Sequence, residues 1–178
     1  LVLSEIIIKE VSAHLEEKVQ HSRNALSKRI RQDSEVLFLE LAAIEMVHKL
    51  LVPEVKDKDF VEKKLTAWIK AVGAEIIPVN GYIEFDTLIN NYFQKQPPFG
   101  NKKKHEFPDA MALMSLEAWA IENKKKILAV STDHDWGKFG AHSEHIDVIE
   151  DLAEAISIFQ PPSLTSNSLS QSLAKLPN

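Results

Sequence analysis

Residues 104–109 (KHEFPD) and 131–136 (STDHDW) decide the fold of this chain. Between them the sequence predicts one helix and then an apolar strand over 127–131, of the kind that is buried on both faces of a parallel sheet. Asp109 stands in the first turn of the helix, and Asp133 lies just beyond the end of the strand. Because ligands bind outside the carboxyl ends of parallel strands, we expect both carboxylates at that edge of the sheet.

Three acids are candidate ligands of a divalent cation: Asp109, Asp133 and Glu10, which lies on the predicted first helix. Three carboxylates at one edge repel one another unless a cation neutralises them. The chain contains no cysteine, so a metal must be held by oxygen or imidazole ligands. We therefore predict Mg²⁺ or Mn²⁺ as the cofactor and hydrolysis of a phosphodiester as the chemistry.

Each of these acids also has a purely structural explanation. Asp133 and Asp135 belong to a residue type that forms turns. Asp109 complements the dipole of its helix, and Glu10 is one of many helical glutamates. Trp136 is expected to pack in the core. The order and spacing of the acids favour a site more than any one of them does.

A long helical hairpin is predicted over residues 5–51. Ser4 is a suitable N-cap for its first helix, and the residues before it read as the end of a strand. Basic residues accumulate over 16–31, and the second helix, over 34–51, is strongly apolar.

Helical periodicity, short apolar runs and turn residues define the rest of the chain. The expected elements are helices over 58–71, 84–94, 108–123 and 151–159, a helical turn at 135–139, and strands over 74–79, 127–131 and 146–149. This alternation predicts the α/β class, as a three-layer α/β/α sandwich with a mostly parallel central sheet. We expect one domain over 1–159 and a linker or tail over 160–178.

Composition narrows the class of protein. The 178 residues are 44% hydrophobic and 26% charged, which is ordinary for a globular domain. No apolar run approaches the length that spans a bilayer, so no membrane partner is expected. The absence of cysteine excludes disulfides and fits a cytoplasmic protein. The net charge of −5 argues against a broadly basic nucleic-acid scaffold, although a local basic patch stays compatible with it.

Three stretches resemble the PIN-domain nucleases: residues 4–11 (SEIIIKEV), 106–110 (EFPDA) and 131–136 (STDHDW). The last fits the family pattern of Ser or Thr, any residue, Asp, any residue, Asp and an aromatic residue. The likeness covers residues 1–159 and is greatest to the branch with a long helical insertion after the first acidic helix. It implies metal-dependent cleavage of RNA, or less often DNA, by a quartet of acids.

The resemblance implies a role for individual residues. Carried over one by one, Glu10 is the second acid, Asp109 the third, Asp133 the fourth, Asp135 an auxiliary acid, and Ser131 a hydroxyl that orients the site. The family's first acid ends an opening strand, and nothing in this sequence precedes Leu1. Two alternatives stay open: a domain that lacks this acid, or a sequence that begins downstream of it.

Three functions are compatible with these residues. The leading hypothesis is a Mg²⁺- or Mn²⁺-dependent endoribonuclease, with a toxin or a defence effector as its setting. The alternatives are an inactive PIN-like module that binds RNA or protein, and a flap-type structure-specific DNA nuclease. Lys102, Lys103, Lys104 and Ser131 are the predicted substrate contacts. The expected partners are nucleic acid, foremost RNA, and a second copy of the chain or an inhibitory protein.

Overall fold

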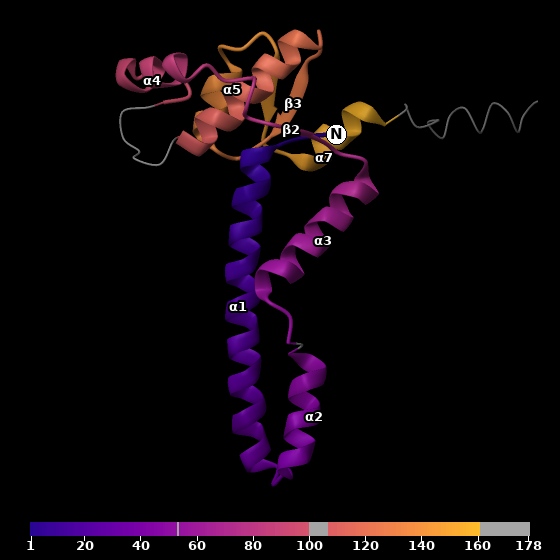
Figure 1. The fold of residues 1–178 in the computed structure, drawn as a ribbon. Coiled ribbons are helices and arrows are strands. Elements are labelled where there is room, and N and C mark those ends of the chain that lie inside the picture. Colours follow the sequence, from indigo (N-terminus) through magenta and orange to yellow (C-terminus); the bar gives the residue numbers. More distant parts are fainter. Residues whose placement is uncertain (53, 100–106, 161–178) are drawn as a thin grey trace, which may run out of the picture. The chain divides into compact units, whose positions relative to one another are not determined.

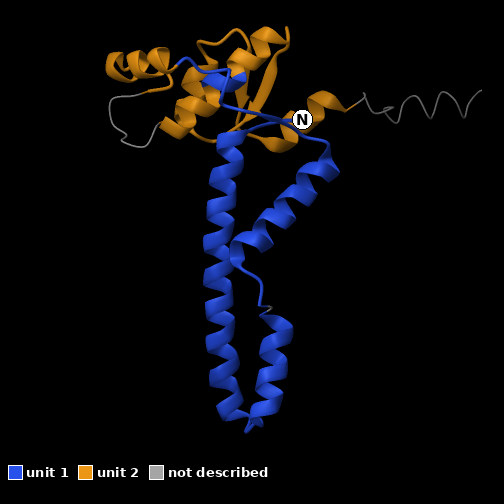
Figure 2. Ribbon diagram, viewed as in Figure 1, with its two compact units in different colours: residues 1–84, 114–116 blue, residues 85–113, 117–178 orange. Residues whose placement is uncertain are grey.

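The computed structural model describes residues 1–52, 54–99 and 107–160, which fall into two compact units (Figures 1 and 2). Unit 1 comprises residues 1–84 and 114–116, and unit 2 comprises 85–113 and 117–178. Each unit contains one short parallel pair of strands. The predicted tail lies outside the described residues, apart from its first residue, Gln160.

Unit 1 begins with a strand that runs directly into a helix. Strand β1 (Val2–Ser4) pairs in parallel with β2 (Glu75–Ile77). Ser4 is buried and caps the helix, because its side chain accepts a hydrogen bond from the backbone N–H of Ile6 at 3.3 Å. This confirms the predicted N-cap.

Helix α1 (Glu5–Val36) is a single helix of 32 residues (Figure 1). The chain then reverses at Phe38, which has a φ of 50°, and α2 (Leu41–Leu51) returns along α1. The predicted hairpin is therefore present, but the boundary of its second helix at residue 34 was wrong. Residues 34–36 complete the last turn of α1 because the backbone N–H of Leu37 still bonds to the carbonyl of Asp33 at 2.9 Å.

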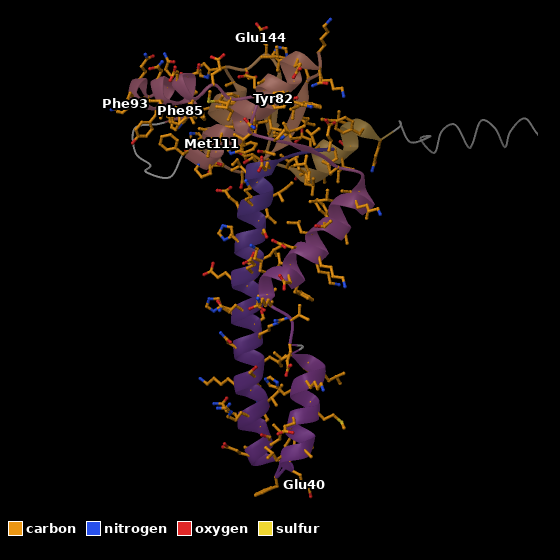
Figure 3. The ribbon with its side chains drawn as sticks, in the orientation of Figure 1. Glu40, Tyr82, Phe85, Phe93, Met111 and Glu144 are labelled. Atoms are coloured by element: carbon orange, nitrogen blue, oxygen red, sulfur yellow. The ribbon has the colours of Figure 1, made fainter. Side chains whose placement is uncertain are left out.

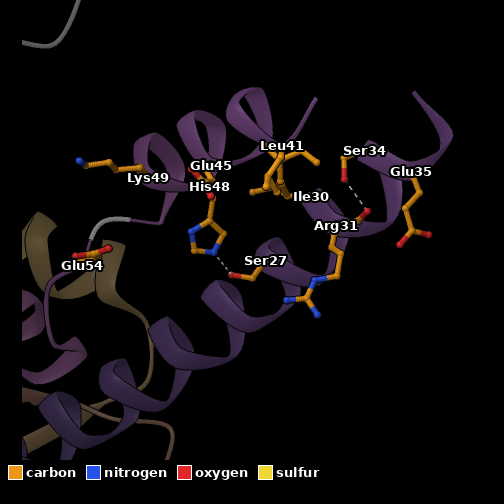
Figure 4. A pocket seen from close by; sticks show the side chains of 11 residues that line it. Ser27, Ile30, Arg31, Ser34, Glu35, Leu41, Glu45, His48, Lys49 and Glu54 are labelled. Atoms are coloured by element: carbon orange, nitrogen blue, oxygen red, sulfur yellow. Dashed lines mark hydrogen bonds between the residues drawn. The ribbon is translucent and has the colours of Figure 1, made fainter. Parts of the chain in front are cut away.

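A groove of about 560 Å³ separates α1 from α2 (Figure 4). Its apolar side chains include Ile30, Leu41 and Ile44, and charged side chains surround them. Ser27 Oγ and His48 Nε2 lie 3.1 Å apart and form a polar contact between the two helices. All of α2 is described, and none of its side chains is buried. The far part of the hairpin is thus loosely packed within unit 1.

Helix α3 (Asp57–Val72) packs against α1 nearer to the strands. Arg23 of α1 forms an ion pair with Asp57, and its guanidinium lies 5.5 Å from the centre of the Phe60 ring. The helix ends at Gly73, whose φ of 63° is the left-handed conformation that favours glycine. Both ends agree with the predicted helix to within one residue.

Unit 2 contains α4 (Phe85–Gln94), α6 (His134–Gly140), α7 (Leu152–Phe159) and α5 (Phe107–Glu122) except for its residues 114–116. Its strands β3 (Ile127–Val130) and β4 (Ile146–Ile149) form one parallel pair. Helix α5 is the most buried element: Ala110, Ala112, Leu113 and Ala120 are fully inaccessible. A helix that is apolar around most of its circumference belongs in a core.

Helix α6 approaches β4 closely at Gly140. A Cβ atom on this glycine would lie 2.7 Å from Cγ2 of Val148 and 3.3 Å from the carbonyl oxygen of Ile146. The helix therefore packs at this distance from the strand only because residue 140 has no side chain. This close packing holds α6 against the pair of strands that precedes and follows it.

The α/β class and the parallel pairing of the strands are confirmed. In the described residues, however, the pairing forms two separate two-stranded sheets, whereas one central sheet was predicted. The strands are only three or four residues long, so each forms few ladder hydrogen bonds. No helix in the described part of the chain combines the length and apolar character that crossing a membrane requires.

Candidate active site

Asp109 lies in the first turn of α5, as the sequence predicted. An aromatic cluster fixes this turn: the ring of Phe107 lies 4.8 Å from that of Tyr92 and 5.2 Å from that of the buried Phe99, measured between centroids. These contacts join the start of α5 to α4 and to the segment after it. The backbone that carries Asp109 is therefore anchored by packing on the side that precedes it.

The Asp109 carboxylate is oriented by one hydrogen bond. Nε1 of Trp136 donates to Oδ1 of Asp109 at 2.9 Å, and the indole ring is buried. Within the part of the chain that the structure describes, this is the only hydrogen bond of that carboxylate. Its second oxygen, Oδ2, is therefore available to a ligand as far as the described residues are concerned.

Asp133 is the N-cap of α6 and has an extended backbone conformation. Its Oδ1 accepts a hydrogen bond from the backbone N–H of Asp135 at 2.8 Å, and its own N–H donates to Oγ of Ser131 at 3.1 Å. The N–H of Ser131 in turn bonds to the carbonyl of Ile149 at 3.0 Å, which extends the pairing of β3 with β4. The sheet thus fixes the position of Asp133 through Ser131.

Asp135 is held differently from the other two acids. Its Oδ1 lies 2.9 Å from Nζ of Lys138, one turn further along α6, and its side chain is only 16% exposed. This ion pair offsets the charge of Asp135 locally. The arrangement suits a supporting role for Asp135 better than that of a ligand.

The two predicted ends of the helix–strand segment meet in unit 2. Trp136 follows Asp133 by three residues on α6, and its indole reaches Asp109 at the start of α5. A single hydrogen bond therefore connects the two elements that carry these acids. The only metal ligands that these acids can offer are carboxylate oxygens, the ligand type that Mg²⁺ and Mn²⁺ prefer.

The remaining predicted residues are distributed elsewhere. Glu10 lies on α1, in unit 1, and is partly buried. The predicted substrate contacts Lys102, Lys103 and Lys104 lie outside the described residues. Among the described residues, no three His, Cys, Asp or Glu side chains are grouped closely enough to hold a metal ion.

Two features of the site were not predicted from the sequence. Trp136 was expected only to pack in the core, but its indole N–H also orients Asp109. Lys138 was not considered, although Asp135 and Lys138 have the spacing of an ion pair on one helix face. The aromatic residue that ends the 131–136 pattern was the available signal for the contact of Trp136 with Asp109. The three-residue spacing of Asp135 and Lys138 was the signal for their ion pair.

The comparison with protein families gave a match. The sequence profile of the PIN domain matches residues 1–136, more than half of the chain, so the chain belongs to the PIN domain family. The match includes Glu10, Asp109, Asp133 and Asp135, and it ends at Trp136. PIN domains are in general nucleases that use divalent metal ions. Comparison with curated proteins and with solved structures gave no match.

Proposed function

We propose that this protein is an endoribonuclease that hydrolyses phosphodiester bonds with Mg²⁺ or Mn²⁺. Asp109 and Asp133 are the proposed ligands in unit 2. Glu10 is a further acid, proposed from its place in the family pattern alone. The observation that carries the proposal is the hydrogen bond from Trp136 to Asp109. It ties the first turn of α5 to the helix that Asp133 caps.

The described contacts support a division of roles among the residues of the site. A bound divalent ion supplies a nucleophilic water and stabilises charge on the phosphate. Trp136 holds one oxygen of Asp109, so the other oxygen keeps a fixed direction. Ser131 fixes the backbone at Asp133, and Lys138 offsets the charge of Asp135. The chain's own contribution is therefore preorganisation of two carboxylates.

The choice of RNA, a cytoplasmic location and a toxin or defence role are the finer parts of the proposal. The choice of RNA and the toxin or defence role rest on the resemblance to the PIN-domain nucleases, and the cytoplasmic location rests on the absence of cysteine. Lys102–Lys104 stay the proposed contacts to the phosphate backbone, because a run of three lysines before α5 suits a polyanion. The substrate test must therefore compare RNA and DNA directly.

The decisive experiment measures cleavage of labelled single-stranded RNA, single-stranded DNA and flap DNA of one sequence, with Mn²⁺, Mg²⁺ or EDTA. We expect RNA to be cut with Mn²⁺ or Mg²⁺ and left intact with EDTA. Asp109→Asn and Asp133→Asn should each lower the rate by at least about tenfold, because each removes the charge of a proposed ligand and changes behind the ligands alone cost about 10- to 100-fold. Cleavage of flap DNA alone would identify the flap-type nuclease instead.

A matched control is available in the same unit. Asp86 also lies in the first turn of a helix, α4, but outside the site. Asp86→Asn should leave the rate unchanged. Metal-dependent cleavage that survives Asp109→Asn would refute the assignment of the site. Tight RNA binding without cleavage in the presence of either metal would favour the inactive binding module.

A further inference from the structure

Unit 2 contains a cavity between the segment that follows α4, the middle of α5 and the end of α6. It has a volume of about 320 Å³. The residues that line it are Gln96, Pro97, Glu117, Phe139, His142 and Ser143, and all of them belong to unit 2. Cavities that bind small ligands begin at about 300 Å³, so this one suits a single ring system such as a nucleobase.

Glu117 brings a fixed carboxylate to this cavity. Oγ of Ser143 donates a hydrogen bond to Oε1 of Glu117 at 2.6 Å. The same hydroxyl accepts from the backbone N–H groups of His145 at 3.1 Å and Ile146 at 3.0 Å, at the start of β4. The strand therefore fixes the hydroxyl, and the hydroxyl fixes the carboxylate. Glu117 forms no other hydrogen bond or ion pair with the residues that the structure describes, so Oε2 can accept from a ligand.

Two more polar side chains line the cavity and keep hydrogen-bonding groups for a ligand. Nδ1 of His142 lies 2.8 Å from the carbonyl oxygen of Lys138, which can only accept, so Nδ1 carries the proton and Nε2 of the neutral ring is an acceptor. The side-chain amide of Gln96 forms no hydrogen bond within the described part of the chain. Pro97 and Phe139 add apolar walls, against which a flat ring can pack.

The carboxylate of Glu117 favours a base with neighbouring donors. Guanine is the RNA base that presents two adjacent donors, N1–H and the N2 amino group, on its Watson–Crick edge, and a carboxylate can accept from both. Adenine and cytosine place a ring nitrogen lone pair beside their amino group, and uracil has one N–H between two carbonyls. Guanine also offers O6 and N7 as acceptors for the amide of Gln96. The polar groups of the cavity therefore match guanine best.

The cavity and the proposed metal ligands lie on the same two helices. Glu117 is roughly 12 Å further along α5 than Asp109, at 1.5 Å per residue. Asp133 caps the start of α6, and Phe139 stands near its end. We propose that the cavity is a base-recognition subsite, in which Glu117 accepts hydrogen bonds from an unpaired guanine of the RNA substrate. This inference rests on the proposed function, because it assigns a base contact to the same nuclease.

The first test compares cleavage of single-stranded RNAs that differ at one position, which carries guanosine, adenosine, cytidine, uridine or inosine in a guanine-free sequence. We expect kcat/KM to be about 10- to 100-fold higher with guanosine than with adenosine, the range of one good bidentate contact, and the cuts to lie at a constant distance from the guanosine. Inosine keeps N1–H but lacks the amino group, so it should fall between the two. Equal cleavage of all five RNAs, or of the inosine and guanosine RNAs, would overturn the proposal.

The second test removes the charge of Glu117. In Glu117→Gln the ratio of kcat/KM for guanosine RNA to that for adenosine RNA should fall at least about tenfold, because the new amide donates where guanine also donates. A partly unfolded sample lowers both rates alike and leaves this ratio unchanged. Glu144→Gln is the matched control: Glu144 follows Ser143, is exposed and is not among the residues that line the cavity (Figure 3). It should keep the wild-type ratio, and an equal fall in both variants would contradict the subsite.

Binding in EDTA separates this inference from the proposed function. Fluorescence anisotropy of the labelled guanosine and adenosine RNAs measures affinity without cleavage, and we expect the guanosine RNA to bind about tenfold more tightly to the wild type but not to Glu117→Gln. If neither metal supports cleavage and this difference persists, the nuclease proposal fails and the guanine subsite stands. If RNA is cut but neither rate nor affinity depends on guanosine, the reverse holds. An arginine-rich peptide that binds the wild type but not Glu117→Gln, while both RNAs bind alike, would show a protein-docking site instead.

Discussion

The indole N–H of Trp136 reaches the Asp109 carboxylate from a buried position, and this contact joins local packing to the proposed chemistry. A buried donor has few alternative partners, so it fixes the acceptor more firmly than water does. The orientation of Asp109 thus depends on a side chain that need not touch substrate. We regard Trp136 as a positioning residue.

Trp136→Phe should separate orientation from packing. Phenylalanine keeps most of the buried ring but lacks the N–H, so we expect a loss of about 1 kcal/mol in the free energy of unfolding. We also expect kcat for RNA cleavage to fall about tenfold with little change in KM, because a misdirected carboxylate weakens the reaction more than binding. Steady-state kinetics and denaturant titration measure both.

A tryptophan outside the site provides the control for this substitution. Trp68 lies on α3 and is 49% exposed, so Trp68→Phe should leave kcat unchanged. An equal fall in kcat for both variants would show that the effect of Trp136→Phe is general. A rise in KM without change in kcat would place Trp136 in substrate binding instead.

At the scale of single elements, the packing of α6 on β4 depends on one glycine. Gly140→Ala places a Cβ 2.7 Å from Cγ2 of Val148, so the helix or the valine must move. We expect a loss of about 1–3 kcal/mol in the free energy of unfolding, as for other overpacked sites. Thermal and denaturant unfolding would measure the change.

Gly137 on the same helix is the matched control. A Cβ at Gly137 meets no atom within 4 Å, so Gly137→Ala should be neutral or stabilise the protein by up to about 1 kcal/mol through helix propensity. Adding Val148→Ala to Gly140→Ala should recover part of the lost stability. If both glycine variants behaved alike, the close approach of α6 to β4 would be contradicted.

The start of α1 is joined to the segment after β2 by Glu5. Its Oε2 accepts a hydrogen bond from the backbone N–H of Val79 at 3.2 Å, and its other oxygen pairs with Lys9. The hydrogen bond from Lys9, the bond from Val79 and the positive charge of Lys9 lower the pKa of Glu5 below its ordinary value. The ionised form is therefore the stabilising one.

This shift predicts how stability depends on pH. A lowered pKa contributes stability above the ordinary glutamate pKa of about 4.3, and that contribution is lost as pH falls through the lower folded value. The melting temperature of Glu5→Gln should lie slightly below that of the wild type from pH 7 to about pH 5 and should converge with it at lower pH. Glu17→Gln, further along α1, should show no such convergence. A constant difference down to the lowest pH would contradict the assignment.

The sequence predicted the elements best where a local signal marks their ends. Strand β4 has the predicted bounds. Ser4 begins α1 and Gly73 ends α3, as expected. The second hairpin helix was placed too early because residues 34–36 continue the helical pattern. The reversal occurs at Phe38, a residue type that rarely adopts a positive φ. Because no glycine or proline marks this turn, the sequence did not predict its position.

At the scale of the whole molecule, chain order predicted which elements meet. Asp109 and Asp133 stand at the two ends of one continuous helix–strand segment, and the hydrogen bond from Trp136 shows that these ends approach each other; the role of both acids stays a prediction. The hydrogen bond of Trp136 and the split into two strand pairs depend on packing between residues distant in sequence, which periodicity does not encode. The role of Glu10 stays a prediction.

Binding of the ion should stabilise the whole protein. At a concentration of Mn²⁺ near 100 times its dissociation constant, we expect about 2.7 kcal/mol of added stability, visible as a rise in melting temperature. Asp133→Asn should abolish most of this rise. Asparagine is also a good N-cap, so the metal-free stability of this variant should be unchanged or higher.

The control for this measurement is again Asp86→Asn, which should show the full rise with Mn²⁺. Potassium chloride at the same ionic strength tests for general screening by salt. A marked fall in the metal-free melting temperature of Asp133→Asn would mean that the charge of Asp133 serves the fold rather than the ion.

Helix α1 follows β1 without a loop and continues for 32 residues (Figure 1). At 1.5 Å per residue it is a stiff spacer of about 48 Å between the strands of unit 1 and the reversal of the chain at Phe38. The far end of the hairpin is therefore kept at a fixed reach from those strands, well beyond the residues of α1 that α3 packs against.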